Sequence, residues 1–109
     1  MPESEPPEEV AASTLRRLFL EARVEERLRN GELTIVVRKN TERPARPQIG
    51  EPPGTVSHAL VYLDPTGTAV AIAHEYLRPD GTTGASGLRD PKWLRHAGRR
   101  YMLARDPTP

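Results

Sequence analysis

The first regular pattern of apolar residues lies between residues 8 and 30. Five apolar residues recur there at spacings of three and four, the repeat of one helix face: Ala11, Leu15, Leu18, Phe19 and Ala22. Pro7 suits the first turn of a helix, and Asn30 with Gly31 suits its end. The pattern predicts one helix that packs this apolar face on the rest of the chain.

The same segment carries a second apolar row, formed by Leu20, Val24 and Leu28. At about 100° per residue, these side chains project almost opposite to the first face of the helix. One interpretation is that a loop or a chain end covers the second row. The other is that the row contacts a protein partner or a second copy of the chain, since contiguous exposed apolar surface marks contact sites.

The pattern then changes to that of strands. Residues 33–38 (LTIVVR) form a short β-rich run, and residues 56–63 and 68–77 form two longer runs separated by the turn sequence DPTG. These two runs predict a hairpin, with proline early in the turn and glycine at its end. Residues 93–103 predict either a last hairpin, which the short link HAG favours, or a helical turn followed by a strand.

Together these elements predict an α+β fold, in which one N-terminal helix packs on a small antiparallel sheet of about four strands. The 109 residues correspond to a single domain, which we place at residues 8–105. Residues 1–7 and 106–109 are expected to be disordered tails. Residues 39–55, with four prolines, are predicted to form a loop that is either disordered or an arm that orders on contact.

Composition narrows the possible classes of function. The chain has no cysteine, which excludes disulfides, thiolate nucleophiles and thiolate metal sites. No apolar run approaches the roughly 20 residues that cross a bilayer, and residues 1–9 are acidic where a secretory signal would be basic. We therefore expect a cytoplasmic protein that has no contact with a membrane and needs no cofactor.

Charge is distributed unevenly along the chain. The net charge is +1, yet residues 84–109 hold six cationic side chains against two aspartates. A basic quarter on a mildly acidic body is a candidate footprint for phosphate. The candidate nucleic-acid-binding residues are Arg89, Lys92, Trp93, Arg95, Arg99 and Arg100. Trp93 either stacks on a base or anchors the core.

Two histidines form the candidate catalytic pair. If the hairpin turn leaves Asp64 opposite Thr68, then His58 lies directly opposite His74, with Tyr76 alongside. Two imidazoles at that distance can act as general base and general acid in phosphodiester cleavage by a ribose 2′-hydroxyl, without a metal. The alternatives are ordinary strand residues or a metal pair. For a metal, only His96 remains as a third nitrogen ligand, and it is remote in sequence, so no metal site is predicted.

Residues 74–92, HEYLRPDGTTGASGLRDPK, resemble a motif of a group of small uncharacterised bacterial proteins. In that group a histidine-bearing strand runs into RPDG and then into a G-x-S-G-x-x-D-P-K loop. The resemblance covers about a fifth of the chain and implies a bacterial or mobile-element origin, with no established activity. In outline, the order of elements also resembles the fold of small bacterial ribonuclease toxins, which is an analogy of fold alone.

These observations favour a small bacterial protein that contacts nucleic acid, RNA rather than DNA, through its C-terminal quarter and the face of the hairpin. Ribonuclease-type activity is open, so the sequence does not decide whether the protein is an enzyme. The alternative is a non-catalytic module that binds a protein partner, or a structural subunit of a homo-oligomer.

Overall fold

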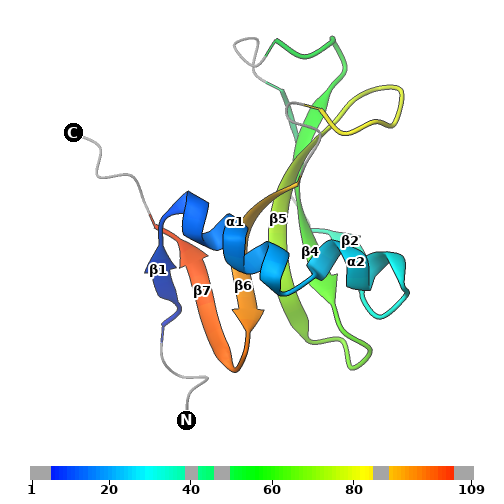
Figure 1. The fold of residues 1–109 in the computed structure, drawn as a ribbon. Helices are drawn as coiled ribbons and strands as arrows, with labels where there is room; N and C mark the ends of the chain where they lie inside the picture. The colour runs from blue at the N-terminus through cyan, green and yellow to red at the C-terminus, as the bar shows by residue number, and fades with distance from the viewer. Residues whose placement is uncertain (1–5, 39–41, 46–49, 85–88, 105–109) are drawn as a thin grey trace, which may run out of the picture.

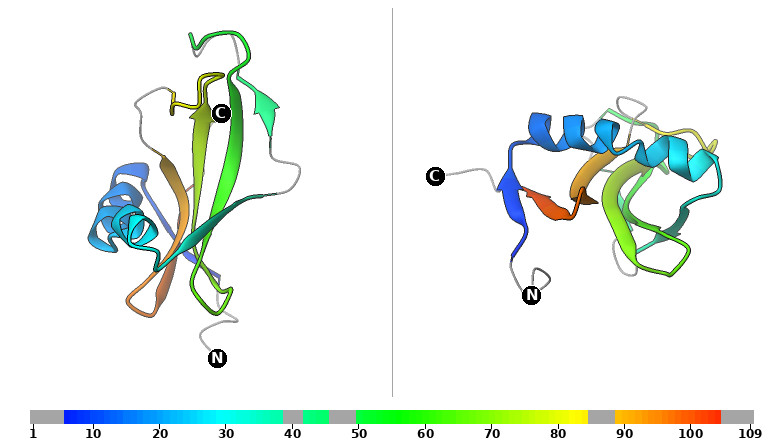
Figure 2. Two further views of the ribbon diagram at one scale, coloured as in Figure 1. Left: turned by 90° about the vertical axis from the view of Figure 1, so that its right-hand side faces the viewer. Right: turned by 60° about the horizontal axis from the view of Figure 1, so that its bottom comes forward.

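The computed structural model of the protein describes residues 6–38, 42–45, 50–84 and 89–104. Two helices lie together on one side of a curved sheet (Figures 1 and 2). The elements, in chain order, are β1 (Glu8–Val10), α1 (Ala12–Glu21), α2 (Val24–Arg29), β2 (Thr34–Val37), β3 (Arg43–Pro44), β4 (Val56–Leu63), β5 (Ala69–Leu77), β6 (Asp90–His96) and β7 (Arg99–Leu103).

The sheet has seven strands within the described residues, in the order β1-β7-β6-β5-β4-β2, and β3 also pairs with β4. Neighbouring strands are antiparallel except for β1, which is parallel to β7. The predicted α+β class is confirmed, but the predicted four-stranded antiparallel sheet is wrong. The strands β1 and β3 lack a β-rich pattern, and they join the sheet through backbone hydrogen bonds at the edges of β7 and β4.

The core lies between the helices and the sheet. Leu15 and Phe19 of α1 are buried there, and the Phe19 ring meets the Tyr62 ring of β4 edge-on, with 5.9 Å between centroids. The other buried hydrophobic residues of this cluster are Ala22, Val24, Leu33, Val70, Ala71, Ala73, Leu94 and Tyr101. The predicted apolar face of the first helix is therefore the face that packs, although Ala11 is exposed at the helix start.

The predicted single helix is in fact two helices with a break at Arg23. Arg23 has a left-handed backbone (φ 55°), and its N–H bonds to the carbonyl of Leu20, which closes the last turn of α1. The break turns α2 so that Val24 is only 1% exposed and Leu28 packs against the core, while Leu20 remains 71% exposed. The row of Leu20, Val24 and Leu28 is therefore divided, because Val24 and Leu28 join the core while Leu20 stays at the surface.

Both predicted hairpins are present. In the β4–β5 turn, the Asp64 carboxylate accepts hydrogen bonds from the backbone N–H groups of Thr66 and Thr68, at 2.9 and 3.0 Å. Gly67 in this turn has a φ of 85°, which glycine adopts without strain. The β6–β7 hairpin turns at Ala97 and Gly98.

The described parts of the proline-rich loop are anchored on the hairpin. Arg43 and Pro44 pair with Ser57 and Val56 of β4, and the Glu51 carboxylate accepts a 2.6 Å hydrogen bond from Arg78. Residues 39–41 and 46–49 of this predicted loop lie outside the described residues, as do most of both predicted tails. No helix in the described ranges is both long enough and apolar enough to span a membrane.

The left-handed backbone at Arg23 leads to a stability prediction. A non-glycine residue in the left-handed conformation destabilises the folded state by roughly 1–2 kcal/mol. Glycine avoids this cost, but it loses more conformational entropy on folding, which offsets part of the gain. Replacing Arg23 with glycine also removes its ion pair with Glu26, but this pair is exposed and contributes little to stability. Arg23→Gly should therefore raise the free energy of unfolding by about 0.5–1 kcal/mol in urea denaturation.

The matched control is Arg17→Gly, which also removes an exposed ion pair, with Glu21, but lies within α1. It should lower the free energy of unfolding by about 1 kcal/mol. Equal destabilisation by both substitutions would contradict the role assigned to the break at Arg23.

Candidate functional site

The β4–β5 register decides where the two histidines lie. At the turn, Asp64 bonds to Thr68 as predicted, and Leu63 pairs with Ala69. The next pair is Tyr62 with Ala71, so Val70 is an extra residue in β5, a β-bulge. Beyond the bulge, every pairing is displaced by one residue from the prediction.

This displacement separates the predicted catalytic pair. His58 pairs with Glu75, and His74 pairs with Ala59. Because side chains alternate between the faces of a strand, His58 faces the helices and His74 faces the opposite side of the sheet. The prediction that the two imidazoles lie opposite each other on one face is wrong, and the bulge at Val70 is the reason.

On the helix side, His58 begins a chain of hydrogen bonds, of which the first is buried and the others are partly buried. His58 Nε2 lies 2.8 Å from Glu75 Oε2, and Glu75 Oε1 accepts a 2.9 Å bond from Arg89 Nε. Arg89 Nη1 donates to Glu25 Oε1 at 3.0 Å, and the Tyr62 hydroxyl donates to Glu25 Oε2 at 2.9 Å. We call these five residues the ionic chain. It joins α2, β4, β5 and the segment that enters β6.

The charge states within the ionic chain follow from its geometry. Burial opposes ionisation of Glu75, but hydrogen bonds from His58 and Arg89 outweigh it and lower the pKa of this carboxyl. Burial and the neighbouring Glu25 carboxylate raise the pKa of Tyr62, which keeps its hydroxyl protonated as a donor. Burial disfavours the Arg89 cation, yet its bond to Glu75 and the nearby acidic groups raise its pKa.

The tautomer of His58 follows from these charges. An ionised Glu75 can only accept a hydrogen bond, so Nε2 of His58 carries a proton. Nδ1 of His58 is buried and has no hydrogen-bond partner among the described residues. The nearest acidic atom to it is Glu42 Oε2, at 3.9 Å. The His58 side chain is thus buried and hydrogen-bonded within the protein, so a substrate cannot reach it.

The opposite face of the sheet carries a row of apolar side chains. One residue from each of five neighbouring strands contributes to it, and each pairs with the next in register: Val36, Val61, Ile72, Trp93 and Met102. Both helices lie on the other side of the sheet (Figure 2). We call this side the open face.

Two arginines adjoin the tryptophan on the open face. Arg95 follows Trp93 by two residues in β6, and its guanidinium carbon lies 5.8 Å from the centroid of the indole ring. Arg95 pairs with Arg100 of β7, as Trp93 pairs with Met102. Alternation along both strands therefore places Trp93, Met102, Arg95 and Arg100 in one patch.

By alternation along β5, His74 and Tyr76 project to the same side as Ile72. Both also line a cavity of about 710 Å³ that includes Phe19 and Leu20 of α1, near the start of β6. The rings of His74 and Tyr76 meet edge-on with 4.9 Å between centroids. The residues paired with them on β4 are small, Ala59 and Ser57. Burial, and then the charge of Lys92, lower the pKa of His74, so its imidazole is neutral at pH 7.

The six predicted nucleic-acid-binding residues therefore divide into two groups. Trp93, Arg95 and Arg100 share the open face. Arg89 is part of the ionic chain, the Lys92 ammonium lies 3.0 Å from Asp90, and Arg99 lies 2.8 Å from Glu8. Lys92 is also the extra residue of a second bulge, where β6 pairs with β5.

Several residues with a role in this arrangement were not predicted from the sequence. Glu25 and Glu75 hold Arg89, although one lies on a helix flank and the other between His74 and Tyr76. Alternation within β5 could have indicated that Glu75 faces inward beside Ala73, but its partners lie too far away in sequence to be inferred. Among the described residues, no group of three or more acidic or histidine side chains is placed to hold a metal ion.

Comparison with known proteins gives no match to a protein-family model, a curated protein or a solved structure. The resemblance of residues 74–92 therefore remains an expectation.

Within residues 74–92, Arg78 bonds to Glu51, and a side chain at Gly84 would lie 2.9 Å from Glu51 and 3.1 Å from Tyr76. These contacts join the end of β5 to the base of the proline-rich loop.

The ionic chain leads to a prediction for stability against pH. The folded-state pKa of Glu75 lies below its unfolded value of about 4.3, so the unfolded chain takes up this proton first as the pH falls. The contribution of Glu75 should be fully present well above pH ~4.3 and should be lost as the pH falls below that value. Urea denaturation at a series of pH values measures this loss.

Glu75→Gln should lower the free energy of unfolding at pH 7 by about 2 kcal/mol, because Arg89 then keeps only its ion pair with Glu25 and the buried His58 loses its charged acceptor. It should also flatten the acid dependence. Part of the slope should persist, since the turn hydrogen bonds from Thr66 and Thr82 lower the pKa values of Asp64 and Asp80. The exposed control Glu21→Gln should change stability by less than about 0.5 kcal/mol, and equal effects would refute the role of the ionic chain.

Proposed function

We propose that the protein binds single-stranded nucleic acid, RNA in preference to DNA, on the open face of its sheet. The observation that carries this proposal is the patch in which Trp93 and Met102 lie beside Arg95 and Arg100. An aromatic ring stacks on the face of any base, and adjacent guanidinium groups bind the phosphates that follow it. RNA is preferred because its unpaired loops and ends expose bases for stacking.

The remainder of the open face supports a binding path longer than one nucleotide. At about 3.3 Å per residue, His74 lies about 7 Å and Tyr76 about 13 Å beyond Ile72, the partner of Trp93. A short single strand that stacks on Trp93 therefore reaches the His74–Tyr76 pair along β5. In this proposal His74 and Tyr76 act as surfaces for bases rather than as catalytic groups.

The arrangement of the two histidines does not favour cleavage of the bound nucleic acid. The general acid and base predicted from the sequence lie on opposite faces of the sheet, and His58 is buried in the ionic chain. A bound strand on the open face would meet only one of the two imidazoles. Binding without hydrolysis is the function that the arrangement of side chains supports best.

A second candidate function is contact with another protein chain along β2. This strand lies at one end of the strand order, and its Val36 and Val37 side chains are 46% and 52% exposed. Exposed apolar edge strands pair readily with strands of other chains. The mass of the protein in solution, measured with and without RNA at two salt concentrations, distinguishes this candidate from nucleic-acid binding by a monomer.

The charged part of the patch leads to the first binding prediction. Arg95→Gln combined with Arg100→Gln should weaken binding of a ten-nucleotide oligouridylate at least about tenfold at low salt. The slope of log affinity against log salt should become shallower by about 1.4, since each lost phosphate contact on a single strand accounts for about 0.7. Fluorescence anisotropy of the labelled oligonucleotide measures both quantities.

The control for this variant is Arg17→Gln combined with Arg99→Gln, which removes the same charge from exposed ion pairs away from the patch. It should retain most of the affinity. Equal weakening by both double variants would indicate a non-specific effect of net charge, and the absence of binding by the parent protein at low salt would refute the proposal.

The stacking surface leads to a separate prediction. Trp93→Leu should lose about 1–3 kcal/mol of binding free energy, while Trp93→Phe should retain most of it, because a phenyl ring still stacks on a base. Since Trp93 is the single tryptophan of the chain, its fluorescence should also be quenched by RNA in the parent protein. Equal affinity of the leucine and phenylalanine variants would show that the bases do not stack at this position.

A further inference from the structure

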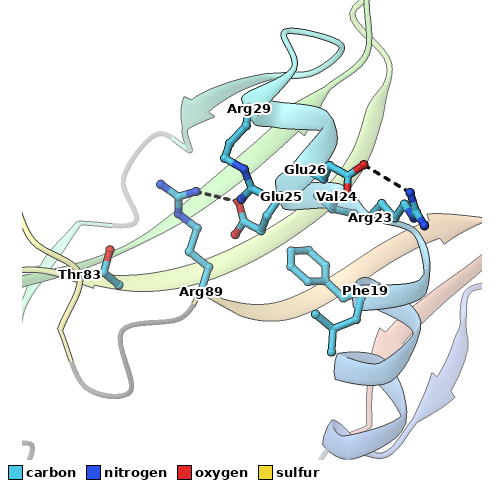
Figure 3. Close-up of a pocket in the computed structure, with 9 residues that line it drawn as sticks. Phe19, Arg23, Val24, Glu25, Glu26, Arg29, Thr83 and Arg89 are labelled. Carbon is cyan, nitrogen blue, oxygen red and sulfur yellow. Dashed lines mark hydrogen bonds and ion pairs between the residues drawn. The ribbon is translucent and has the colours of Figure 1, made fainter.

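A cavity of about 620 Å³ lies on the helix side of the sheet, beside the joint between α1 and α2 (Figure 3). It shares four lining residues, Phe19, Leu20, Glu25 and Arg89, with a neighbouring cavity of about 710 Å³. The residues that line the first cavity alone are Arg23, Val24, Glu26, Arg29 and Thr83. The neighbouring cavity is also lined by His74 and Tyr76, whereas Trp93, Arg95, Arg100 and Met102 line neither cavity. A ligand in the first cavity therefore does not depend on nucleic-acid binding at that patch.

The charged groups around the first cavity do not balance. Its lining contains three arginines and two glutamates, an excess of one positive charge. Arg89 is paired with Glu25 at 3.0 Å, and Arg23 is paired with Glu26 at 3.4 Å. Arg29 is the remaining cation, and it has no carboxylate within ion-pair distance among the described residues.

The side chain of Arg29 points toward the other charged groups that line the cavity. Arg29 lies in the last turn of α2, and in Figure 3 its side chain extends toward the ion pair between Glu25 and Arg89. Two guanidinium groups thus border the cavity near one carboxylate, and that carboxylate already accepts bonds from Arg89 and Tyr62. An anionic group of a ligand would supply the counter-charge that Arg29 lacks.

Apart from Thr83, the remainder of the lining is apolar. Phe19 and Val24 are buried, and Leu20 is 71% exposed at the rim. A ligand with a hydrocarbon part would cover Leu20 and remove apolar surface from water. The volume of the cavity falls within the range of about 300–1,000 Å³ that is typical of small-molecule sites.

We propose that this cavity binds a small monoanion with an apolar body, such as a medium-chain carboxylate. Its carboxylate pairs with Arg29, and its hydrocarbon chain packs on Leu20 and Phe19. A monoanion fits better than a phosphate dianion, because only one lining cation lacks a counter-charge and Glu25 and Glu26 would repel a second negative charge. The Thr83 hydroxyl, across the cavity from the helices, is a further group that can donate a hydrogen bond to the ligand.

The proposal is tested with octanoate, measured by isothermal titration calorimetry on the full chain. Acetate carries the carboxylate without the hydrocarbon chain, and 1-octanol carries the chain without the charge. Octanoate should bind saturably at one site, and each of the other two probes should bind at least about tenfold more weakly. Comparable binding of 1-octanol would show an apolar cavity without selection for an anion and would overturn the proposal.

Variants of Arg29 locate the binding site. Arg29→Gln should weaken octanoate binding about tenfold or more, and Arg29→Lys should retain part of the affinity because it keeps the charge. Arg17→Gln, an equally charged change on the exposed flank of α1, should bind like the parent protein. Arg29 is exposed, so its replacement should leave the melting temperature unchanged, which is checked on each variant.

A second substitution tests the apolar part of the site. Leu20→Asn keeps the charge of the cavity and should reduce the advantage of octanoate over acetate about threefold or more, since less hydrocarbon surface is covered. If octanoate binds Arg29→Gln as tightly as it binds the parent protein, or does not bind the parent at all at millimolar concentration, the proposed site is wrong.

Discussion

The arrangement of this protein depends on the pairing of the partly buried Arg89 guanidinium with two carboxylates. Glu75 of β5 and Glu25 of α2 both bind this cation. The second oxygen of each carboxylate is hydrogen-bonded to a residue of β4, His58 for Glu75 and Tyr62 for Glu25. Glu75 is only 7% exposed, so leaving its charge without a partner would be costly, and the packing of the hairpin against the segment that enters β6 is stabilised by completing the ionic chain. The chain thereby holds α2 over the sheet and fixes the segment that enters β6.

The bulge at Val70 determines which side chains can take part in that pairing. Without the extra residue, His58 would lie opposite His74, and Glu75 would not lie beside it. With the extra residue, Glu75 and His58 share the helix side, while His74 and Tyr76 turn to the open face. A single residue in one strand therefore separates a buried polar interior from an aromatic and basic surface, because side chains alternate strictly along each strand.

The two proposed sites use opposite sides of the same sheet. The open face presents Trp93 with Arg95 and Arg100, a combination suited to an extended polyanion with stacked bases. The cavity at the α1–α2 joint presents a single uncompensated arginine beside an exposed leucine, a combination suited to a small amphipathic anion. Arg89 also lines the cavity, but its charge is already paired with Glu25 and Glu75.

The sequence by itself determined the elements whose signals are local. The apolar face that includes Leu15 and Phe19, the β4–β5 hairpin with its DPTG turn and the β6–β7 hairpin could all be predicted, because periodicity and turn chemistry act over a few residues. Only the tertiary structure decided the break at Arg23, the pairing of β1 and β3, the bulge at Val70 and the ionic chain. Arg23 carries no glycine or proline signal, and β1 and β3 are held by backbone groups that any sequence offers. The ionic chain joins residues up to 64 positions apart, and its energy exists only after burial has removed water from the charges.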